Sequence, residues 1–325
     1  MVLGLDGGTW RLLKPWIAEN KLPTFRSIAD SGSTATLKST IPCSTVPALP
    51  SLLTGMSPGS HRFLSFIKPN GAPVTFQDIK YPKLWDVLGK HALRSCIVGV
   101  RATFPPERLN GVMISGSIPS EKSYYTYPRY LKERFRFKDD KHEKGIRDLR
   151  RKKGNKTHRR KLVDLICEQT KSRYDIFKKL NQEENYDFSM FWIAEMDTLQ
   201  HLLWEYRDCL LDLYIIVDNI VADLLSTFPD RTLFIVSDHG FGPTPSNFFF
   251  VNTWLQKEGY LQQKRLIPMP LLNLGLFFAY KAIGALSSGR ALKFRKLLTL
   301  LTRMRSLRSK DSMTQRCAIM KIDAP

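Results

Sequence analysis

Cysteine is scarce in this sequence, and its spacing offers no framework for disulfide bonds. Five cysteines are spread over 325 residues, and no two of them form a CxxC pair. An odd number at wide intervals argues against a disulfide-stabilised scaffold and favours a reduced, cytosolic setting. Zinc-finger and RNA-recognition motifs are also lacking, which argues against sequence-specific binding to nucleic acid. We therefore expect a cytoplasmic protein, with peripheral attachment to a membrane surface as the alternative.

Acidic residues are few beside the basic ones. The chain has 30 acidic and 50 basic residues, which gives a formal net charge of +20. The basic residues concentrate in Arg129–Lys161 and Lys293–Lys310. Such runs are usually solvated helical faces. They would also attract phosphate-rich partners such as an anionic membrane surface, nucleotides or nucleic acid, and both interpretations stay open.

Uninterrupted apolar runs of membrane-spanning length are lacking. Leu266–Leu286 is about long enough to cross a bilayer, but it contains Pro268, Pro270, Asn273 and Lys281. Two prolines and a central lysine favour a buried or interfacial helical hairpin over a membrane span. The basic amphipathic segment that follows would suit a membrane surface or a helix packed on the rest of the protein.

Short apolar runs alternate with helical patterns in the rest of the chain. Strands are predicted at Val2–Leu5, Ser95–Val100, Gly111–Ser115, Phe188–Ala194 and Thr232–Ser237, and helices at Pro15–Ser31, Pro47–Thr54 and Lys83–His91. This alternation predicts an α/β fold with a mostly parallel sheet covered by helices. We expect residues 1–120 and 186–262 to form the two parts of this core. Residues 121–185 are interpreted as a basic helical insertion or cap, and residues 263–325 as an apolar and basic helical region or the start of a further insertion.

Three acidic residues lie at or just beyond the ends of predicted strands. Asp6 follows the run VLGL, Asp197 follows FSMFWIA, and Asp238 follows LFIVS. Any one of them is typical of a turn or a helix N-cap. In open α/β sheets, however, ligands bind at the carboxyl ends of the strands. The three acids together therefore predict a shared site.

Two histidines accompany these acids. Asp197 and His201 are four residues apart, so on a helix they share one face and can bind one metal ion jointly. Asp238 and His239 are adjacent, and Gly240 permits the chain to turn there. A surface pair and an ordinary strand-to-loop transition are the alternatives. Agreement between the two pairs favours metal binding.

Thr45 lies just before a predicted helix in the segment CSTVPALPSLLTG. Pro47 is well placed as the first helical residue, which leaves unpaired backbone N–H groups near Thr45. Those groups could hold a phosphate that the Thr45 hydroxyl attacks, once a metal ion lowers the pKa of that hydroxyl. The alternative is that Thr45 only caps the helix. Cys43 is expected to be a small buried side chain.

These motifs resemble the alkaline phosphatase superfamily, and specifically its type I phosphodiesterase/nucleotide pyrophosphatase branch, which includes phosphohydrolase/phosphomutase-like proteins. The matching pieces are GLDGGTW, LPTFRSIADSG, STIPCSTVPALPSLLTGMSPGSH, LWDVLGKHALRSCIVGVRATFPPERLNGVMISG, DTLQH and VSDHGFGP. The resemblance covers roughly residues 1–120 and 185–262. It implies an alkaline-phosphatase-like α/β core and hydrolysis of phosphodiester or nucleotide pyrophosphate bonds.

The resemblance also implies a two-metal site that holds zinc, or alternatively manganese. For one ion it implies the ligands Asp6, Thr45, Asp238 and His239, and for the other Asp197 and His201. Thr45 would be the nucleophile and would form a phosphothreonine intermediate, while the backbone N–H of Val46 would help to hold the phosphate. A phosphate ester or a nucleotide would be the substrate.

The sequence departs from the family pattern in the ligands of the second ion. The family supplies a further histidine from a C-terminal segment, and no histidine follows His239 here. We interpret this as a chain truncated before that segment, or as a degenerate relative. Two other functions stay open: a phosphomonoesterase or phosphotransferase of the same superfamily, and a catalytically impaired protein that binds a membrane surface through the region Leu266–Arg308.

Overall fold

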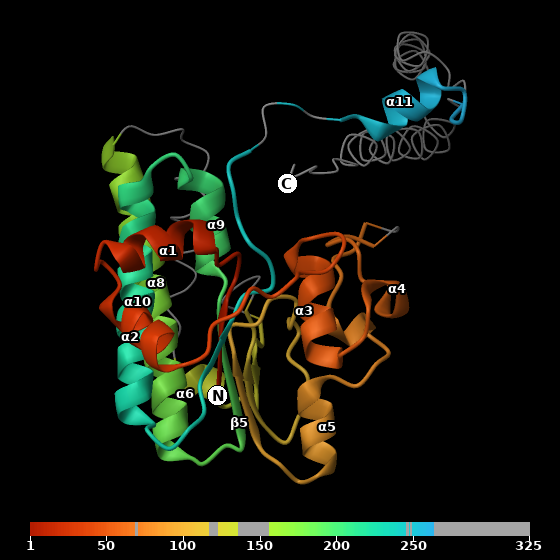
Figure 1. Cartoon of the computed structure of the whole chain (residues 1–325). Helices are drawn as coiled ribbons and strands as arrows, with labels where there is room; N and C mark the ends of the chain where they lie inside the picture. The colour runs from red at the N-terminus through yellow and green to blue at the C-terminus, as the bar shows by residue number, and fades with distance from the viewer. Residues whose placement is uncertain (69–70, 117–122, 136–155, 245–246, 248, 263–325) are drawn as a thin grey trace, which may run out of the picture. The chain divides into compact units, whose positions relative to one another are not determined.

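A computed structural model describes residues 1–68, 71–116, 123–135, 156–244, 247 and 249–262 (Figure 1). The chain divides into two compact units, Met1–Pro243 and Thr244–Pro325. The apolar stretch Leu266–Leu286 and the basic stretch Lys293–Lys310 lie outside the described residues, as does residue 317, the fifth cysteine. The four cysteines in the described part of the chain form no disulfide bond.

The first unit is built on one six-stranded sheet. Its strands are β1 (Val2–Leu5), β2 (Ser95–Val98), β3 (Gly111–Ile114), β4 (Thr126–Tyr127), β5 (Phe188–Ile193) and β6 (Phe234–Val236). They lie in the order β4-β3-β2-β5-β1-β6, and every neighbouring pair is parallel except β3 and β4. This sheet confirms the predicted α/β class and all five predicted strands.

Helices cover both faces of the sheet. They are α1 (Trp10–Ala18), α2 (Pro23–Ser31), α3 (Thr45–Thr54), α4 (Pro58–His61), α5 (Leu84–Lys90), α6 (Leu131–Arg134), α8 (Lys156–Glu183), α9 (Glu195–Leu203) and α10 (Arg207–Thr227). Figure 1 shows α1, α2, α8, α9 and α10 on one face, and α3, α4 and α5 on the other. In the second unit, the described residues include α11 (Val251–Lys257).

The two faces of the sheet pack against separate apolar cores. On β5, Phe191 and Ile193 point into the core beneath α8 and α10, while Met190 and Trp192 point into the core beneath α3. Successive side chains of a strand point to opposite faces, so a strand that is apolar throughout serves both cores. This explains the run FSMFWI, which is apolar at every position except Ser189 and is buried from the second residue onward.

The prediction of one helix over Pro15–Ser31 is wrong, because the structure has two. α1 ends at Ala18, and α2 begins at Pro23. A residue that precedes proline is disfavoured in the α region, and Leu22 has the non-helical angles φ −127° and ψ 73°. The new helix start is held by Asp218 of α10, whose carboxylate accepts hydrogen bonds from the N–H groups of Thr24 and Phe25 at 3.1 and 2.8 Å.

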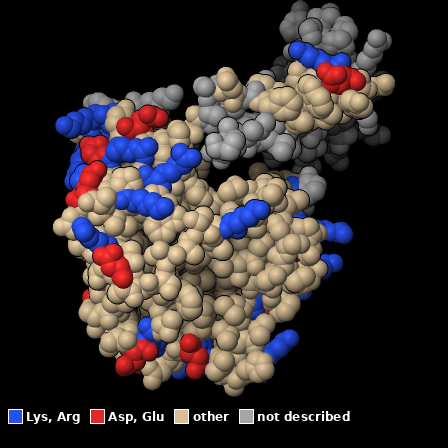
Figure 2. Space-filling view, in the orientation of Figure 1, with Lys and Arg blue, Asp and Glu red and all other residues tan. Residues whose placement is uncertain are grey.

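Basic side chains in the described part of Arg129–Lys161 have acidic or aromatic neighbours. Arg160 lies 2.6 Å from a carboxylate oxygen of Asp212, Arg134 forms an ion pair with Glu183, and Arg159 lies over the ring of Tyr206. On the face seen in Figure 2, lysine and arginine side chains are interspersed with acidic ones. The interpretation of residues 121–185 as an insertion or cap remains a proposal. No helix within the described residues is both long and apolar enough to cross a membrane.

Candidate active site

The candidate site lies where three adjacent strands end. β1 is paired on one side with β5 and on the other with β6, and all three run in parallel. Asp6 directly follows β1, Asp238 follows β6 by two residues, and Asp197 lies in the first turn of α9, directly after β5. Because the carboxyl ends of parallel strands meet at one edge, the sheet brings the three acids together, as the sequence predicted.

The hydroxyl of Thr45 lies among these groups. Its Oγ1 is 3.1 Å from Oδ1 of Asp6 and 3.0 Å from Nε2 of His239. Nδ1 of His239 lies 2.8 Å from the carbonyl oxygen of Gly240, so we assign the ring proton to Nδ1 and leave a lone pair on Nε2. A hydroxyl carries one proton and can satisfy only one of these two acceptors at a time.

Asp238 adds a further acceptor that has no donor. Its Oδ1 accepts a hydrogen bond from the N–H of Gly7 at 3.2 Å, while its buried Oδ2 has no hydrogen-bond partner among the described residues. Burial, reinforced by the neighbouring charge of Asp6, raises the pKa of Asp238 to about 7. An unpartnered buried oxygen costs free energy that a bound cation would recover.

A cation fits this cluster. Asp6, Asp238 and His239 each offer a ligand atom, and these atoms all lie within 4.8 Å of one another. Carboxylate oxygens and an imidazole nitrogen are a donor set that zinc and manganese accept. The Thr45 hydroxyl offers one proton to more than one acceptor, and Oδ2 of Asp238 has no donor at all among the described residues. A divalent ion would bind these surplus acceptor atoms.

Asp197 and His201 share one face of α9, as their spacing predicted. Oδ1 of Asp197 lies 3.3 Å from Nε2 of His201, whose ring packs edge-on against Phe241. Burial opposes ionisation of Asp197, but its hydrogen bond to His201 and the positive charges of His201 and Arg101 lower its pKa. No third Cys, His, Asp or Glu within the described residues joins this pair as a ligand.

Arg101 is a site residue that the sequence reasoning missed. Its Nε donates to Oδ2 of Asp6 at 2.6 Å, and its Nη2 lies 3.5 Å from Oδ2 of Asp197. Nη2 also donates to the carbonyl of Ala194 at 2.8 Å and to Oγ1 of Thr198 at 3.3 Å. Arg101 comes shortly after β2, at the same edge of the sheet as the acids. The rule that located the acids could have located it, had basic residues been considered.

Asp6 and Arg101 each shift the pKa of the other. Burial raises the pKa of the Asp6 carboxyl, and the Arg101 guanidinium only partly offsets this rise. Burial would lower the pKa of Arg101, but the carboxylates of Asp6 and Asp197 outweigh it and raise that pKa. Arg101 is therefore a permanent cation at the centre of the site.

Comparison with known families matches residues 1–297 to the family described as type I phosphodiesterase / nucleotide pyrophosphatase. The chain belongs to this family. A search of curated proteins finds no match. Membership confirms the resemblance drawn from the motifs, and it makes the chain a hydrolase of phosphoric ester bonds.

In this hydrolase the nucleophile candidate begins a helix. The expected helix start at Pro47 is wrong by two residues, because α3 begins at Thr45 and its N-cap is Ser44. The N–H groups at the first two helical positions, Thr45 and Val46, have no partner within the helix. Thr45 does not cap the helix, since its hydroxyl is engaged with Asp6 and His239. Cys43 is exposed rather than buried, because it lies in the exposed loop before the N-cap.

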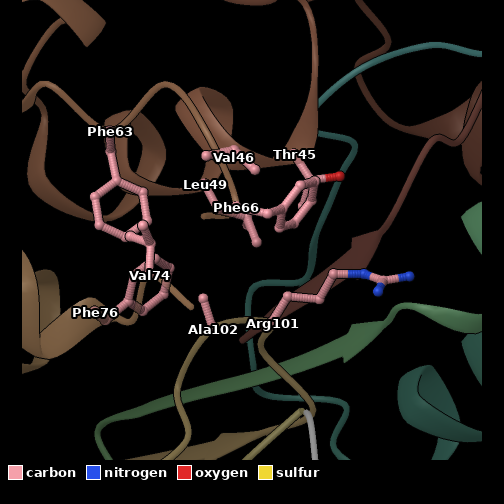
Figure 3. A pocket seen from close by; sticks show the side chains of 9 residues that line it. All are labelled: Thr45, Val46, Leu49, Phe63, Phe66, Val74, Phe76, Arg101 and Ala102. Carbon is pink, nitrogen blue, oxygen red and sulfur yellow. The ribbon is translucent and has the colours of Figure 1, made fainter. Parts of the chain in front are cut away.

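A small pocket opens beside the candidate site. Thr45 and Arg101 border it, and the remaining lining is apolar (Figure 3): Val46, Leu49, Phe63, Phe66, Val74, Phe76 and Ala102. Phe66 is 58% exposed, whereas Leu49 and Phe76 belong to the buried core beneath α3. The pocket therefore offers apolar surface beside Thr45 and Arg101, whose polar ends point away from it (Figure 3).

Proposed function

We propose that the chain is a metal-dependent phosphohydrolase that cleaves phosphodiester or nucleotide pyrophosphate bonds with Thr45 as its nucleophile. The observation that carries the proposal is the position of the Thr45 hydroxyl, 3.1 Å from Asp6 and 3.0 Å from His239 at the start of α3. A hydroxyl at a helix N-terminus, beside a cation site, is where a phosphate would meet both a nucleophile and positive charge.

One divalent ion, zinc or manganese, would be held by Asp6, Asp238, His239 and the oxygen of Thr45. Bound there, it would lower the pKa of the hydroxyl and neutralise charge on the phosphate. The unpartnered Oδ2 of Asp238 and the surplus of acceptors around Thr45 support this assignment. Asp197 and His201 offer two ligands for the second ion that the family resemblance implies.

The residues of the chain would act in two steps. Thr45 Oγ1 would attack phosphorus in line with the leaving oxygen, so that an O–P bond to Thr45 forms as the ester bond breaks. Water would then hydrolyse the resulting phosphothreonine and release phosphate or a phosphate monoester. The N–H groups of Thr45 and Val46, together with the positive end of the α3 dipole, would hold phosphate oxygens during both steps.

The first test is Thr45→Ala in the metal-loaded protein. We expect turnover of a diester such as bis(p-nitrophenyl) phosphate to fall by at least about 10³-fold, since nucleophile removal leaves only the rest of the site. Thr45→Ser should retain part of the activity and should carry a covalent p-nitrophenyl phosphoryl group on residue 45, formed as one p-nitrophenol leaves and detected by mass spectrometry after acid quench. Undiminished turnover by Thr45→Ala would remove Thr45 from the mechanism.

The second test separates a diesterase from the phosphomonoesterase or phosphotransferase alternative. Initial rates on p-nitrophenyl phosphate and on its bis ester are compared with Zn²⁺ and with Mn²⁺. A higher kcat/KM on the diester supports the proposal, and a higher value on the monoester supports the alternative. Adding an alcohol acceptor and measuring the transferred phosphate distinguishes hydrolysis from transfer.

A further inference from the structure

Arg101 occupies the space between the two groups of candidate metal ligands. It donates to Oδ2 of Asp6 at 2.6 Å, while the other oxygen of Asp6 faces Thr45 and His239. It also approaches Oδ2 of Asp197 at 3.5 Å, while the other oxygen of Asp197 faces His201. The guanidinium thus contacts one carboxylate from each group of ligands, through Oδ2 of Asp6 and Oδ2 of Asp197.

The guanidinium is held firmly in this place. Nη2 donates to the carbonyl of Ala194 and to the hydroxyl of Thr198, both at the junction of β5 and α9. A planar guanidinium with several donors in use loses little further freedom and cannot be deprotonated at ordinary pH. The guanidinium of Arg101 is therefore a positive charge in a fixed position.

The two ligand groups differ in what they lack. The group around Thr45 has more acceptors than protons, including the unpartnered Oδ2 of Asp238. In the other group, Asp197 is already paired through both oxygens, with His201 and with Arg101. Protein zinc sites use at least three protein ligands, whereas this group offers two among the described residues. A divalent ion placed there would also face the charge of Arg101.

We propose that Arg101 supplies the second positive charge of the active site, so that the chain binds one divalent cation beside Thr45 and no second ion at Asp197 and His201. This inference rests on the proposed function. Arg101 then acts on the substrate directly, as a phosphate-binding residue. Its Nη1 donates no hydrogen bond within the described part of the chain. Arg101 lines the same pocket as Thr45, and its guanidinium and the Thr45 hydroxyl both point away from the apolar lining (Figure 3). A guanidinium so placed donates to a phosphoryl oxygen as charge develops on it.

Metal stoichiometry tests the first half of the proposal without any measurement of activity. The protein and its Arg101→Ala variant are dialysed against Zn²⁺ or Mn²⁺, and bound metal is counted by mass spectrometry. We expect one ion per chain in the wild type and a second, weaker ion in Arg101→Ala. That second ion should be lost again in Arg101→Ala/His201→Ala. Arg26→Ala, which removes an exposed arginine, is the matched control and should bind one ion.

Two ions on the wild type would overturn the assignment of Arg101 while leaving the metal-dependent hydrolase intact. Binding of no ion by any of the proteins would overturn the cation site itself, and with it the proposed function. If Arg101→Ala does not fold, Arg101→Lys keeps the test open. A lysine retains the charge but cannot bridge both carboxylates with a planar fork, so we expect partial uptake of the second ion.

Phosphate binding tests the second half. With one ion bound per chain, Arg101→Ala/His201→Ala should bind inorganic phosphate at least tenfold more weakly than His201→Ala, and its kcat on the diester should be at least 100-fold lower. Added guanidinium ion at millimolar concentration should restore part of the kcat in Arg101→Ala/His201→Ala and should leave His201→Ala and Arg26→Ala unchanged. Equal phosphate affinity of His201→Ala and of a folded Arg101→Ala/His201→Ala variant with an intact first ion would overturn the role in phosphate binding.

Discussion

The indole of Trp192 lies directly over Gly4, and a Cβ added to Gly4 would fall 1.8 Å from a carbon of that ring. The two residues are opposite partners on β5 and β1. From this position the indole N–H of Trp192 reaches Oδ2 of Asp6 at 3.3 Å. Because Gly4 has no side chain, the indole of Trp192 fits over it and can donate a hydrogen bond to Asp6.

We expect Gly4→Ala to destabilise the protein by about 3 kcal/mol or more, because the methyl group and the fully buried indole cannot occupy the same space. Urea unfolding gives the free energy of unfolding. Gly242→Ala is the matched control, since a Cβ there meets nothing within 4 Å, and its effect should stay within about 0.5 kcal/mol. Equal stability of Gly4→Ala and wild type would contradict the packing described for Trp192.

The metal-free protein should lose stability as the pH rises from about 4 to about 7. Burial and the charge of Asp6 raise the pKa of Asp238 from 3.8 to about 7, so over this interval the folded protein holds a proton that the unfolded chain has released. We expect a decrease on the order of 2 kcal/mol in the free energy of unfolding with a chelator present. Asp238→Asn should flatten this dependence. A metal-free stability that rises through the same interval would contradict the assignment.

The two site histidines should differ in their effect on cation affinity. His239 lies in the ligand cluster beside Thr45, whereas His201 belongs to the pair that Arg101 contacts. We expect His239→Ala to weaken the affinity for the divalent ion beside Thr45 by at least about 100-fold. His201→Ala should change that affinity by less than about threefold. Isothermal titration with Zn²⁺ measures both. Equal losses for the two variants would mean that the histidines serve one shared ion or two coupled ions.

Asp218 should be important for stability although it lies far in the sequence from its partners in α2. Its carboxylate is buried and accepts hydrogen bonds from the N–H groups of Thr24 and Phe25 at the start of α2. Asp218→Ala leaves both groups without that acceptor and should cost about 2–4 kcal/mol. The exposed Asp230→Ala is the control and should change the free energy of unfolding by less than about 0.5 kcal/mol.

Much of the candidate site could be predicted because parallel strands bring their carboxyl ends to one edge. Asp6, Asp197 and Asp238 were located by that rule, since each follows an apolar run that is a strand in the structure. The i, i+4 spacing placed His201 beside Asp197 for an equally local reason. A local sequence pattern is enough to predict a site residue where the geometry of a single strand or helix determines which side chains lie next to each other.

Arg101 was missed because its role depends on contacts between separate strands. Its partners Asp6 and Asp197 are distant in sequence, and an arginine after a strand is common on any protein surface. The division of Pro15–Ser31 into two helices was missed for a related reason. Pro23 gave a local signal for a helix start, but the partner that holds this start is Asp218 of α10, which no local pattern reveals.

In the part of the chain that the structure describes, β1 pairs with β5 and β6, both of which lie far downstream in the sequence. The backbone groups of Val2 can pair in the sheet only after Met190 on one side and Phe234 on the other have been synthesised. Such distant pairing is slow and leaves a nascent apolar strand exposed to aggregation. The same arrangement completes the candidate cation site late in synthesis, because Asp6 follows β1 whereas Asp238 and His239 follow β6.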